Sequence, residues 1–205
     1  MTKLQRDTVV RTALTLLNEV GLDGLTTRRL AERLGVQQPA LYWHFRNKQA
    51  LIAALAEAMM AESHDRSAPR PNEDWRAFLT ANARSFRKSL LAYRDGARIH
   101  AGTRPSTPQM AAVEAQIRLL HAAGFQPADA ASALLVISHY VVGSVLEQQT
   151  ALDAGESKAD GEAATAENAP LLAAAMEELD ESGPDATFEY GLDTIIEGLA
   201  QRRNS

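Results

Sequence analysis

The sequence predicts an all-α protein of about ten helices, with a three-helix helix-turn-helix head at residues 1–47 and a larger helical body at residues 48–205. Ala and Leu are abundant, only 5% of the residues are aromatic, and runs of β-branched residues are few, which favours helices over strands. Apolar residues recur at helical spacing along most of the chain. A chain of 205 residues can bury a sizeable core.

Two amphipathic helices flank the central part of the head. Apolar residues at helical spacing predict a first helix over residues 5–20, which Gly21 ends in a left-handed cap. A longer helix with an apolar inner face is predicted over residues 48–63. We expect this second helix to link the head to the body.

Between them lie two short helices around a glycine-centred turn, the spacing of a helix-turn-helix motif. Thr26 or Thr27 caps the first of the two, Gly35 ends it, and Pro39 stands in the first turn of the second. Apolar residues on both helices and in the turn would form the small core that fixes their crossing: Leu30, Ala31, Leu34, Val36, Leu41 and Phe45.

The body is predicted to contain six further helices, near residues 75–92, 95–100, 107–123, 128–150, 168–181 and 185–201. Residues 153–167 are small and charged and have no apolar face. We expect them to form a flexible loop.

Charge is distributed unevenly along the chain. The net charge is −5, but residues 1–48 carry eight Lys or Arg against four Asp or Glu, a net of +4, which leaves −9 for the remainder. A basic head on an acidic body suits attraction to nucleic acid phosphates at one end only. A DNA-packaging protein is disfavoured, because the net acidic body would repel duplex DNA.

Several classes of site are excluded by composition. The chain has no cysteine, so disulfides, cysteine zinc sites and thiol nucleophiles are ruled out. The first residues lack the apolar stretch of a signal peptide, and no segment offers about 18 uninterrupted apolar residues. We therefore expect a cytoplasmic protein with no membrane partner.

The outer face of the second short helix is placed to enter the major groove of DNA. Four side chains are candidates for reading bases: Arg28, Gln38, Pro39 and Ala40. Others suit phosphate contacts, namely Thr27, Tyr42, His44 and Lys48, and Trp43 completes the predicted DNA-binding set. Tyr42 and Trp43 also fit an ordinary packing role, and Arg28 and Gln38 also fit a solvated surface.

The segment over residues 24–48, which contains Thr-Thr-Arg-Arg-Leu-Ala-Glu-Arg-Leu-Gly-Val-Gln-Gln-Pro-Ala-Leu-Tyr-Trp-His-Phe, resembles the head of the bacterial TetR family. Residues 92–105 and 138–149 resemble the body of those members that respond to tetracycline. The resemblance runs almost continuously over residues 1–150 and is looser over residues 168–201. It implies a repressor that binds palindromic operator DNA, is released by tetracycline carrying Mg²⁺, and controls an efflux resistance gene.

The resemblance also implies a homodimer, in which the 128–150 and 185–201 helices or their neighbours form a four-helix bundle. It assigns ligand contacts to His64, Asn82, Phe86, His100, Thr103, Val113, Gln116, Leu134, Ser138 and Glu147. Among these, His100 is implied as the direct Mg²⁺ ligand, with Thr103 and the partner subunit's Glu147 acting through water.

Elementary chemistry agrees with parts of this assignment. Asn82 and Phe86 are four residues apart on one helix, so both can face one pocket. Gln116 stands among apolar neighbours, where an unpaired amide is costly. Mg²⁺ prefers oxygen ligands, so a lone histidine such as His100 makes a poor site unless the ligand brings its own oxygens. Metal and drug are therefore expected to bind as a unit.

Other interpretations remain open at this stage. The chain could be a TetR-type repressor that responds to a different lipophilic molecule. An enzyme using His64, His100 or Glu147 is a third class, but the sequence has no His-Glu-x-x-His motif, nucleophile elbow or phosphate loop. For a repressor, we expect the bound ligand to shift residues 95–105, which then push the 48–63 helix and change the separation of the two heads of the dimer. To bind a palindrome, the two recognition helices must stand one helical turn of DNA apart, about 34 to 36 Å.

Overall fold

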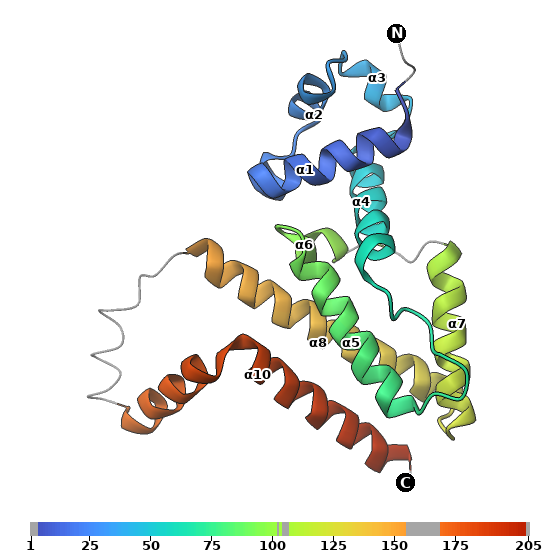
Figure 1. Ribbon diagram of the computed structural model, residues 1–205, viewed down its shortest axis with the longest axis vertical. Coiled ribbons are helices and arrows are strands. Elements are labelled where there is room, and N and C mark those ends of the chain that lie inside the picture. Colours follow the sequence, from blue (N-terminus) through green and yellow to red (C-terminus); the bar gives the residue numbers. More distant parts are fainter. Residues whose placement is uncertain (1–3, 102, 104–106, 155–168, 204–205) are drawn as a thin grey trace.

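The computed structural model describes residues 4–101, 103, 107–154 and 169–203, and over these residues it forms nine helices and no strand. Figure 1 shows a small head of three helices at one end, a connecting helix, and a larger body of crossing helices at the other. The all-α prediction, with an N-terminal helix-turn-helix and a helical body, is confirmed.

The head consists of α1 (Arg6–Gly24), α2 (Thr27–Leu34) and α3 (Pro39–Tyr42). Thr26 caps α2 by accepting a hydrogen bond from the Arg29 amide, at 3.2 Å, and Gly35 ends it with a φ of +66°. Gly21 interrupts α1 with a φ of +70°, a conformation that costs glycine little, and the chain then makes one more turn to Gly24. The helix predicted over residues 5–20 and its break at Gly21 are therefore confirmed, and the short turn that follows Gly21 was not predicted.

The predicted core of the head is confirmed. Leu30, Ala31, Leu41 and Phe45 are buried, and Leu34 and Val36 pack against them while remaining partly exposed. Burial of these side chains fixes the angle between α2 and α3, so the exposed side of α3 has a defined orientation.

The connecting helix α4 (Lys48–Ser63) has the predicted bounds. Asn47 caps it, with its Oδ1 accepting a hydrogen bond from the Ala50 amide at 2.8 Å. Leu51, Leu55 and Met59 are buried along one face. In Figure 1, α4 runs from beneath the head into the body, so both parts of the chain pack against it.

The body is arranged around α5 (Trp75–Leu91), which packs against α4, α6 (Gly96–His100), α8 (Pro127–Ala154) and α10 (Pro170–Arg203), while α7 (Thr107–Ala122) packs on α8. Asp74 caps α5 by accepting hydrogen bonds from the amides of Arg76 and Ala77, at 2.9 and 3.1 Å. Because α5 touches four helices, its side chains connect most of the body.

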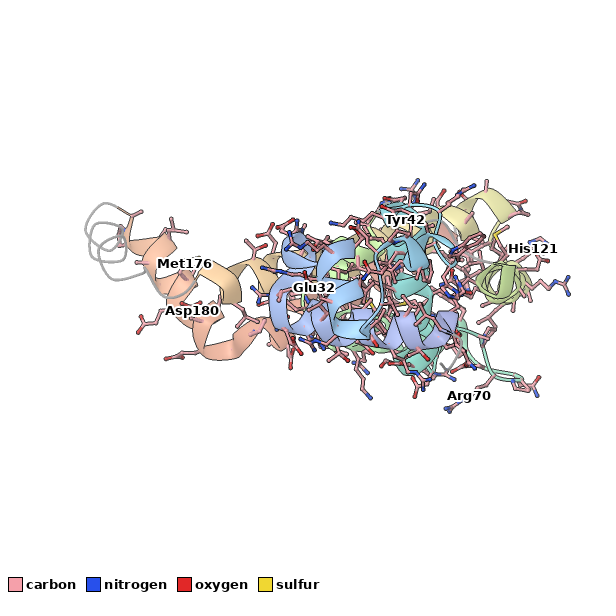
Figure 2. All side chains as sticks on the ribbon, turned by 90° about the horizontal axis from the view of Figure 1, so that it is seen from above. Glu32, Tyr42, Arg70, His121, Met176 and Asp180 are labelled. Carbon is pink, nitrogen blue, oxygen red and sulfur yellow. The ribbon has the colours of Figure 1, made fainter. Side chains whose placement is uncertain are left out.

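The last element, α10, is bent at Gly183, which has a φ of +76° and precedes Pro184. The two helices predicted near residues 168–181 and 185–201 are the two parts of α10 on either side of this bend. The part before the bend projects as an arm from the body, which Figures 1 and 2 show, and Figure 2 labels Met176 and Asp180 along it. Its apolar side chains Leu171, Leu172, Met176 and Leu179 are exposed.

The flexible loop predicted at residues 153–167 begins too early, because α8 continues through Asp153 to Ala154. Residues 155–167 of that prediction lie outside the described residues.

One long face of α8 is exposed although α8 is rich in apolar residues. Over residues 130–150, its exposed residues fall at helical spacing on a single face: Ser132, Leu135, Val136, His139, Gly143, Leu146, Glu147 and Thr150. Residues 127–152 of this helix are long and apolar enough to cross a membrane by length and composition, but only 28% of that segment's most apolar window is buried. Within the described part of the chain, this face therefore has no partner.

Candidate functional site

The end of α3 that is predicted to read DNA is preorganised. Gln38 and Trp43 flank α3 and have helical backbone angles themselves, so a helical conformation extends over residues 38–43. The Gln38 side chain donates a hydrogen bond from Nε2 to the Thr27 hydroxyl, at 2.7 Å. This contact leaves the Gln38 Oε1 and the second Nε2 hydrogen for a base edge.

The head also exposes aromatic and basic side chains. Trp43 is 89% exposed and Tyr42 is 51% exposed, so the packing interpretation is wrong for Trp43 within the single chain. Arg28 is exposed and pairs with Glu32 at 3.0 Å. The remaining predicted contacts lie on the same head, with Pro39 and Lys48 exposed and Ala40 and His44 half-buried.

Three aromatic rings meet where α4, α5 and α6 approach one another in the body. The Phe86 ring on α5 lies 4.8 Å from the His100 ring, edge to face, and 5.7 Å from the His64 ring, measured between ring centroids. His64 follows the last residue of α4, and His100 is the last residue of α6. The structure thus brings together three residues that are far apart in the sequence.

Polar groups surround this ring cluster. The Asn82 Nδ2 donates a hydrogen bond to the Arg66 carbonyl at 2.8 Å and lies 3.4 Å from the His64 Nε2. The buried Gln116 amide donates to the Ser67 carbonyl at 2.6 Å, which satisfies the group expected to be costly if unpaired. Asn82 and Gln116 therefore both bind the segment that links α4 to α5.

Burial controls the protonation of both histidines. It lowers the pKa of His64 to about 4, and it lowers the pKa of His100 as well. Both rings are therefore neutral near pH 7, the state in which a ring nitrogen can bind a metal or accept a hydrogen bond.

The residues around His100 fit a metal ion only if a ligand supplies most of the oxygens. The His100 Nδ1 is buried and has no hydrogen-bond partner among the described residues. The Thr103 hydroxyl donates to the His100 carbonyl at 2.7 Å, so this hydroxyl lies close to the end of α6. The described part of the chain holds no group of three or more His, Asp or Glu side chains that could bind a metal. The donor set suits a metal that arrives already chelated.

The other predicted ligand contacts lie on α7 and α8. Val113, Leu134 and Ser138 are half-buried, and Leu134 packs against the core. Glu147 is exposed on the unpartnered face of α8, so within a single chain it faces solvent.

Sequence reasoning missed a direct link between the body and the head. The Asp95 Oδ2 accepts a hydrogen bond from the Leu22 amide at 2.7 Å, and Arg98 pairs with Asp23 at 3.0 Å and with Asp95 at 2.9 Å. Asn18 adds a third contact between head and body by accepting from the Arg94 amide, at 2.9 Å. The start of α6 is thus bonded to the end of α1, while its other end carries His100.

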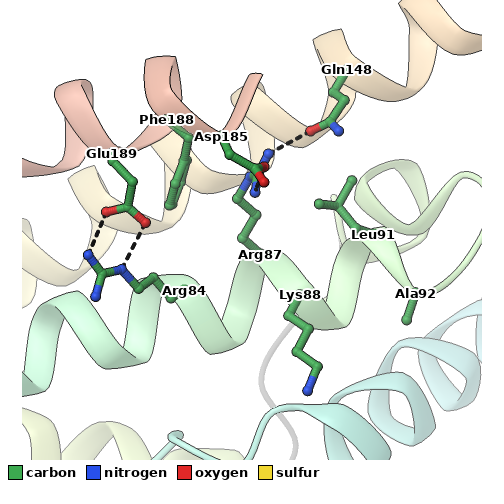
Figure 3. A pocket seen from close by; sticks show the side chains of 9 residues that line it. All are labelled: Arg84, Arg87, Lys88, Leu91, Ala92, Gln148, Asp185, Phe188 and Glu189. Atoms are coloured by element: carbon green, nitrogen blue, oxygen red, sulfur yellow. Dashed lines mark hydrogen bonds and ion pairs between the residues drawn. The ribbon is translucent and has the colours of Figure 1, made fainter. Parts of the chain in front are cut away.

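A separate cleft of about 530 Å³ opens between α5, α8 and α10, and none of the predicted ligand contacts lines it. Figure 3 shows that ion pairs bridge its walls. Arg84 binds Glu189 through two bonds of 2.8 Å, and Arg87 binds Asp185 at 2.7 Å and Gln148 at 2.8 Å. The pairs with Glu189 and Asp185 hold the second part of α10 against α5, and the bond to Gln148 joins α5 to α8, so these contacts have a structural role.

Two protein families match the chain. Residues 9–55 match "Bacterial regulatory proteins, tetR family", and residues 68–203 match "Tetracyclin repressor-like, C-terminal domain". The tetracycline repressor protein class A from transposon 1721 of Escherichia coli is 64% identical over 206 residues, covering 99% of this chain and 94% of that protein.

Solved structures agree in fold. The TetR Q116A variant from Acinetobacter baumannii AYE, in complex with minocycline, has a TM-score of 0.84 and 56% identity, covering 99% of this chain and 100% of that one. TetR class A in complex with 5a,6-anhydrotetracycline and magnesium has a TM-score of 0.75 and 56% identity, covering 97% and 99% of the two chains. From these matches and the helix-turn-helix head, the chain belongs to the TetR family, and it is a DNA-binding regulator rather than an enzyme.

Proposed function

We propose that the protein is a transcriptional repressor that binds a palindromic operator as a homodimer and leaves it when tetracycline and Mg²⁺ bind, which would induce a tetracycline efflux gene. The observation that carries the proposal is the position of α6. One end of this helix carries His100 in the ring cluster with Phe86 and His64, and the other end is bonded to α1 of the head.

The proposed drug contacts surround that cluster. His64, Asn82 and Phe86 would hold one end of the drug, and Gln116 would supply a further polar contact. Val113, Leu134 and Ser138 would form the wall on the side of α7 and α8. The names of the relatives support this choice, because they include repressors bound to minocycline and to anhydrotetracycline with magnesium.

The Mg²⁺ would be held by His100 directly and, through water, by Thr103 and Glu147 of the partner subunit. When bound with the drug, the ion supplies positive charge that oxygen atoms of the drug share. The neutral state of His100 at pH 7 supports this role, since a protonated ring cannot bind a cation.

The unpartnered apolar surfaces of the chain support the homodimer. We propose that α8 and the part of α10 after Gly183 pair with their copies in a four-helix bundle. Leu135, Val136 and Leu146 on α8 and Tyr190 on α10 are exposed in one chain. Ser132, His139 and Glu147 share the α8 face, and such side chains are costly in lipid, so a second protein surface suits this face better than a membrane does. This supports a cytoplasmic location.

In this proposal residues 1–47 bind DNA and residues 48–205 bind the ligand and the partner subunit. The bases would be contacted by Arg28, Gln38, Pro39 and Ala40. The DNA phosphates would be contacted by Thr27, Tyr42, His44 and Lys48, and Trp43 completes the DNA-binding surface. The exposure of Tyr42 and Trp43 supports their assignment.

Release of the operator would follow from movement of α6. The ligand would favour one position of residues 95–105, and α6 would transmit it to the head by packing on α4 and through its bonds to α1. Two heads whose separation no longer matches one helical turn of DNA cannot both bind. The ligand thus shifts the population towards the state that it binds better.

The deciding experiment measures operator binding by fluorescence anisotropy during titration with tetracycline, with Mg²⁺ and with a chelator. We expect release only when drug and metal are both present. Retention of the operator at saturating drug and metal would contradict the proposal. His100→Ala should bind the operator normally but need far more drug for release; loss of operator binding would instead make His100 a structural residue.

The resemblance leaves one alternative, a TetR-type repressor released by a different lipophilic molecule. The intrinsic fluorescence of Trp75, which is buried in the body, gives a direct comparison when it is measured in a Trp43→Phe variant, because Trp43 is the other tryptophan of the chain. Quenching by tetracycline that requires Mg²⁺ supports the first proposal, and no response with either component supports the alternative.

A further inference from the structure

Ser85 on α5 is buried, with 6% of its surface exposed, and its hydroxyl meets three polar groups. The Ser85 Oγ lies 2.9 Å from the His64 Nδ1, 2.9 Å from the Asp65 Oδ1 and 3.3 Å from the Arg66 amide nitrogen. A serine hydroxyl has one hydrogen to donate and two lone pairs that accept. These three contacts therefore use its full capacity.

The direction of each hydrogen bond follows from the chemistry of the partners. The bond from Ser85 lowers the pKa of Asp65, so this carboxylate is ionised at pH 7 and can only accept. The Arg66 amide can only donate. The single Ser85 hydrogen is thus given to Asp65, and the remaining contact requires His64 to donate from Nδ1.

We propose that Ser85, oriented by Asp65, is a positioning residue for ligand recognition: it fixes the Nδ1–H tautomer of His64 and directs the bare Nε2 towards the ligand. This inference rests on the proposed function. Nε2 lies beside the Asn82 amide at 3.4 Å, and the ring lies next to Phe86. Because a bare Nε2 can only accept a hydrogen bond, a ligand oxygen that meets it must be protonated, for example as a hydroxyl group.

The tautomer can be measured in the ligand-free protein by long-range ¹H–¹⁵N NMR of histidine rings. The chain has five histidines, and the signal lost in His64→Gln identifies His64. We expect the Nδ1–H pattern in the unmodified protein. In Asp65→Ala the Ser85 hydrogen becomes free to point at Nδ1, so the tautomer should shift towards Nε2–H. An Nε2–H ring in the unmodified protein, or no shift in Asp65→Ala, would overturn the proposal.

Two variants serve as matched controls. Asp65→Asn keeps a carbonyl oxygen that accepts from Ser85, so the Nδ1–H tautomer should persist. Glu114→Ala removes another exposed carboxylate, which pairs with Arg118 on α7, and should leave the His64 signal unchanged. Because Asp65 is exposed, its variants should fold, which circular dichroism can verify. A merely structural role of Asp65 would move none of these ring signals.

Ligand affinity provides the functional readout. Loss of the positioning hydrogen bond in Ser85→Ala should weaken tetracycline and Mg²⁺ binding roughly tenfold. Asp65→Ala should also bind more weakly, and Asp65→Asn should restore affinity. Equal affinity in all variants would remove Ser85 and Asp65 from ligand recognition. If the unmodified protein bound no tetracycline, the proposed function would fail, but the measured tautomer would still test the geometry.

Discussion

Gln38 and Arg28, which are predicted to read bases, are held differently in the free protein. The Thr27 hydroxyl orients the Gln38 amide at 2.7 Å, so Gln38 needs little rearrangement to meet a base. Arg28 is paired with Glu32 on the surface, and exposed pairs of this kind are weak. DNA can therefore compete for the Arg28 guanidinium at small cost.

Replacing Arg28 with Ala should weaken operator binding by about 1 to 3 kcal/mol and relax selectivity at one base pair. Anisotropy titrations with operators that vary at single positions would measure both effects. Arg118→Ala is a matched control, because Arg118 also pairs with a glutamate four residues away, but on α7. Unchanged affinity in Arg28→Ala would remove Arg28 from the base-reading set.

The half-buried His64 ring should make stability depend on pH. Its pKa falls from 6.5 to about 4 on folding, so between these values the unfolded chain binds more protons than the folded one. The free energy of unfolding should fall as pH decreases from about 6.5 to 4, by at most about 3 kcal/mol from this residue. Urea unfolding at several pH values measures how the free energy of unfolding depends on pH. This dependence should be weaker for His64→Gln than for the unmodified protein, and equal dependence would contradict this account.

At the scale of elements, α6 is short but joins two functional regions. Its first residues are bonded to α1 and its last residue, His100, lies against Phe86. Gly96 allows this arrangement, since a Cβ at that position would lie 2.0 Å from the Leu90 carbonyl oxygen. Only glycine permits α6 to pack so closely on the end of α5.

Replacing Arg98 with Ala should separate drug binding from operator release. The variant loses the pairs with Asp23 and Asp95 but keeps the ring cluster, so drug affinity should remain and release should need more drug. Fluorescence titration would measure the first quantity and operator anisotropy the second. A parallel loss of both would mean that Arg98 supports the pocket rather than the link.

Elements of this protein that are defined by local interactions are predictable from the sequence, and those defined by contacts between distant residues are not. Helix bounds were predictable because the caps are local, as at Gly35 and at Asn47. The two helices predicted near residues 168–181 and 185–201 leave a gap where the structure bends at Gly183, and Gly followed by Pro is a local signal for such a break. The Asp95 bond to Leu22 joins residues 73 apart, and no local pattern reports it. Ser85 was missed for the same reason, since its partners lie in residues 64–66, outside α5. The members of the ring cluster, His64, Phe86 and His100, were named only through the resemblance.

At the scale of the whole molecule, a single chain exposes a face that a second copy would cover. Gly143 lies at the centre of the exposed α8 face, and a Cβ there would meet nothing within 4 Å in the described part of the chain. A large side chain at this position should therefore leave the single chain intact and act only on the proposed bundle.

We predict that Gly143→Arg is a folded monomer that no longer binds the operator tightly. Light scattering after size exclusion would give the mass, and circular dichroism would confirm that helix content is kept. Asp129→Arg is the matched control, because it adds the same side chain to α8 at its first turn. This variant should remain dimeric. A dimeric Gly143→Arg protein would place the partner on another face.

The bonds between α6 and α1 have a thermodynamic corollary. If occupancy of the body disfavours the DNA-competent arrangement of the heads, then the operator must lower the affinity for the drug by the same factor, because the two equilibria form a closed cycle. Promoter-bound molecules would then take up antibiotic less readily than free ones, so a drug affinity measured on the free protein would overstate the response of a repressor already seated on its promoter.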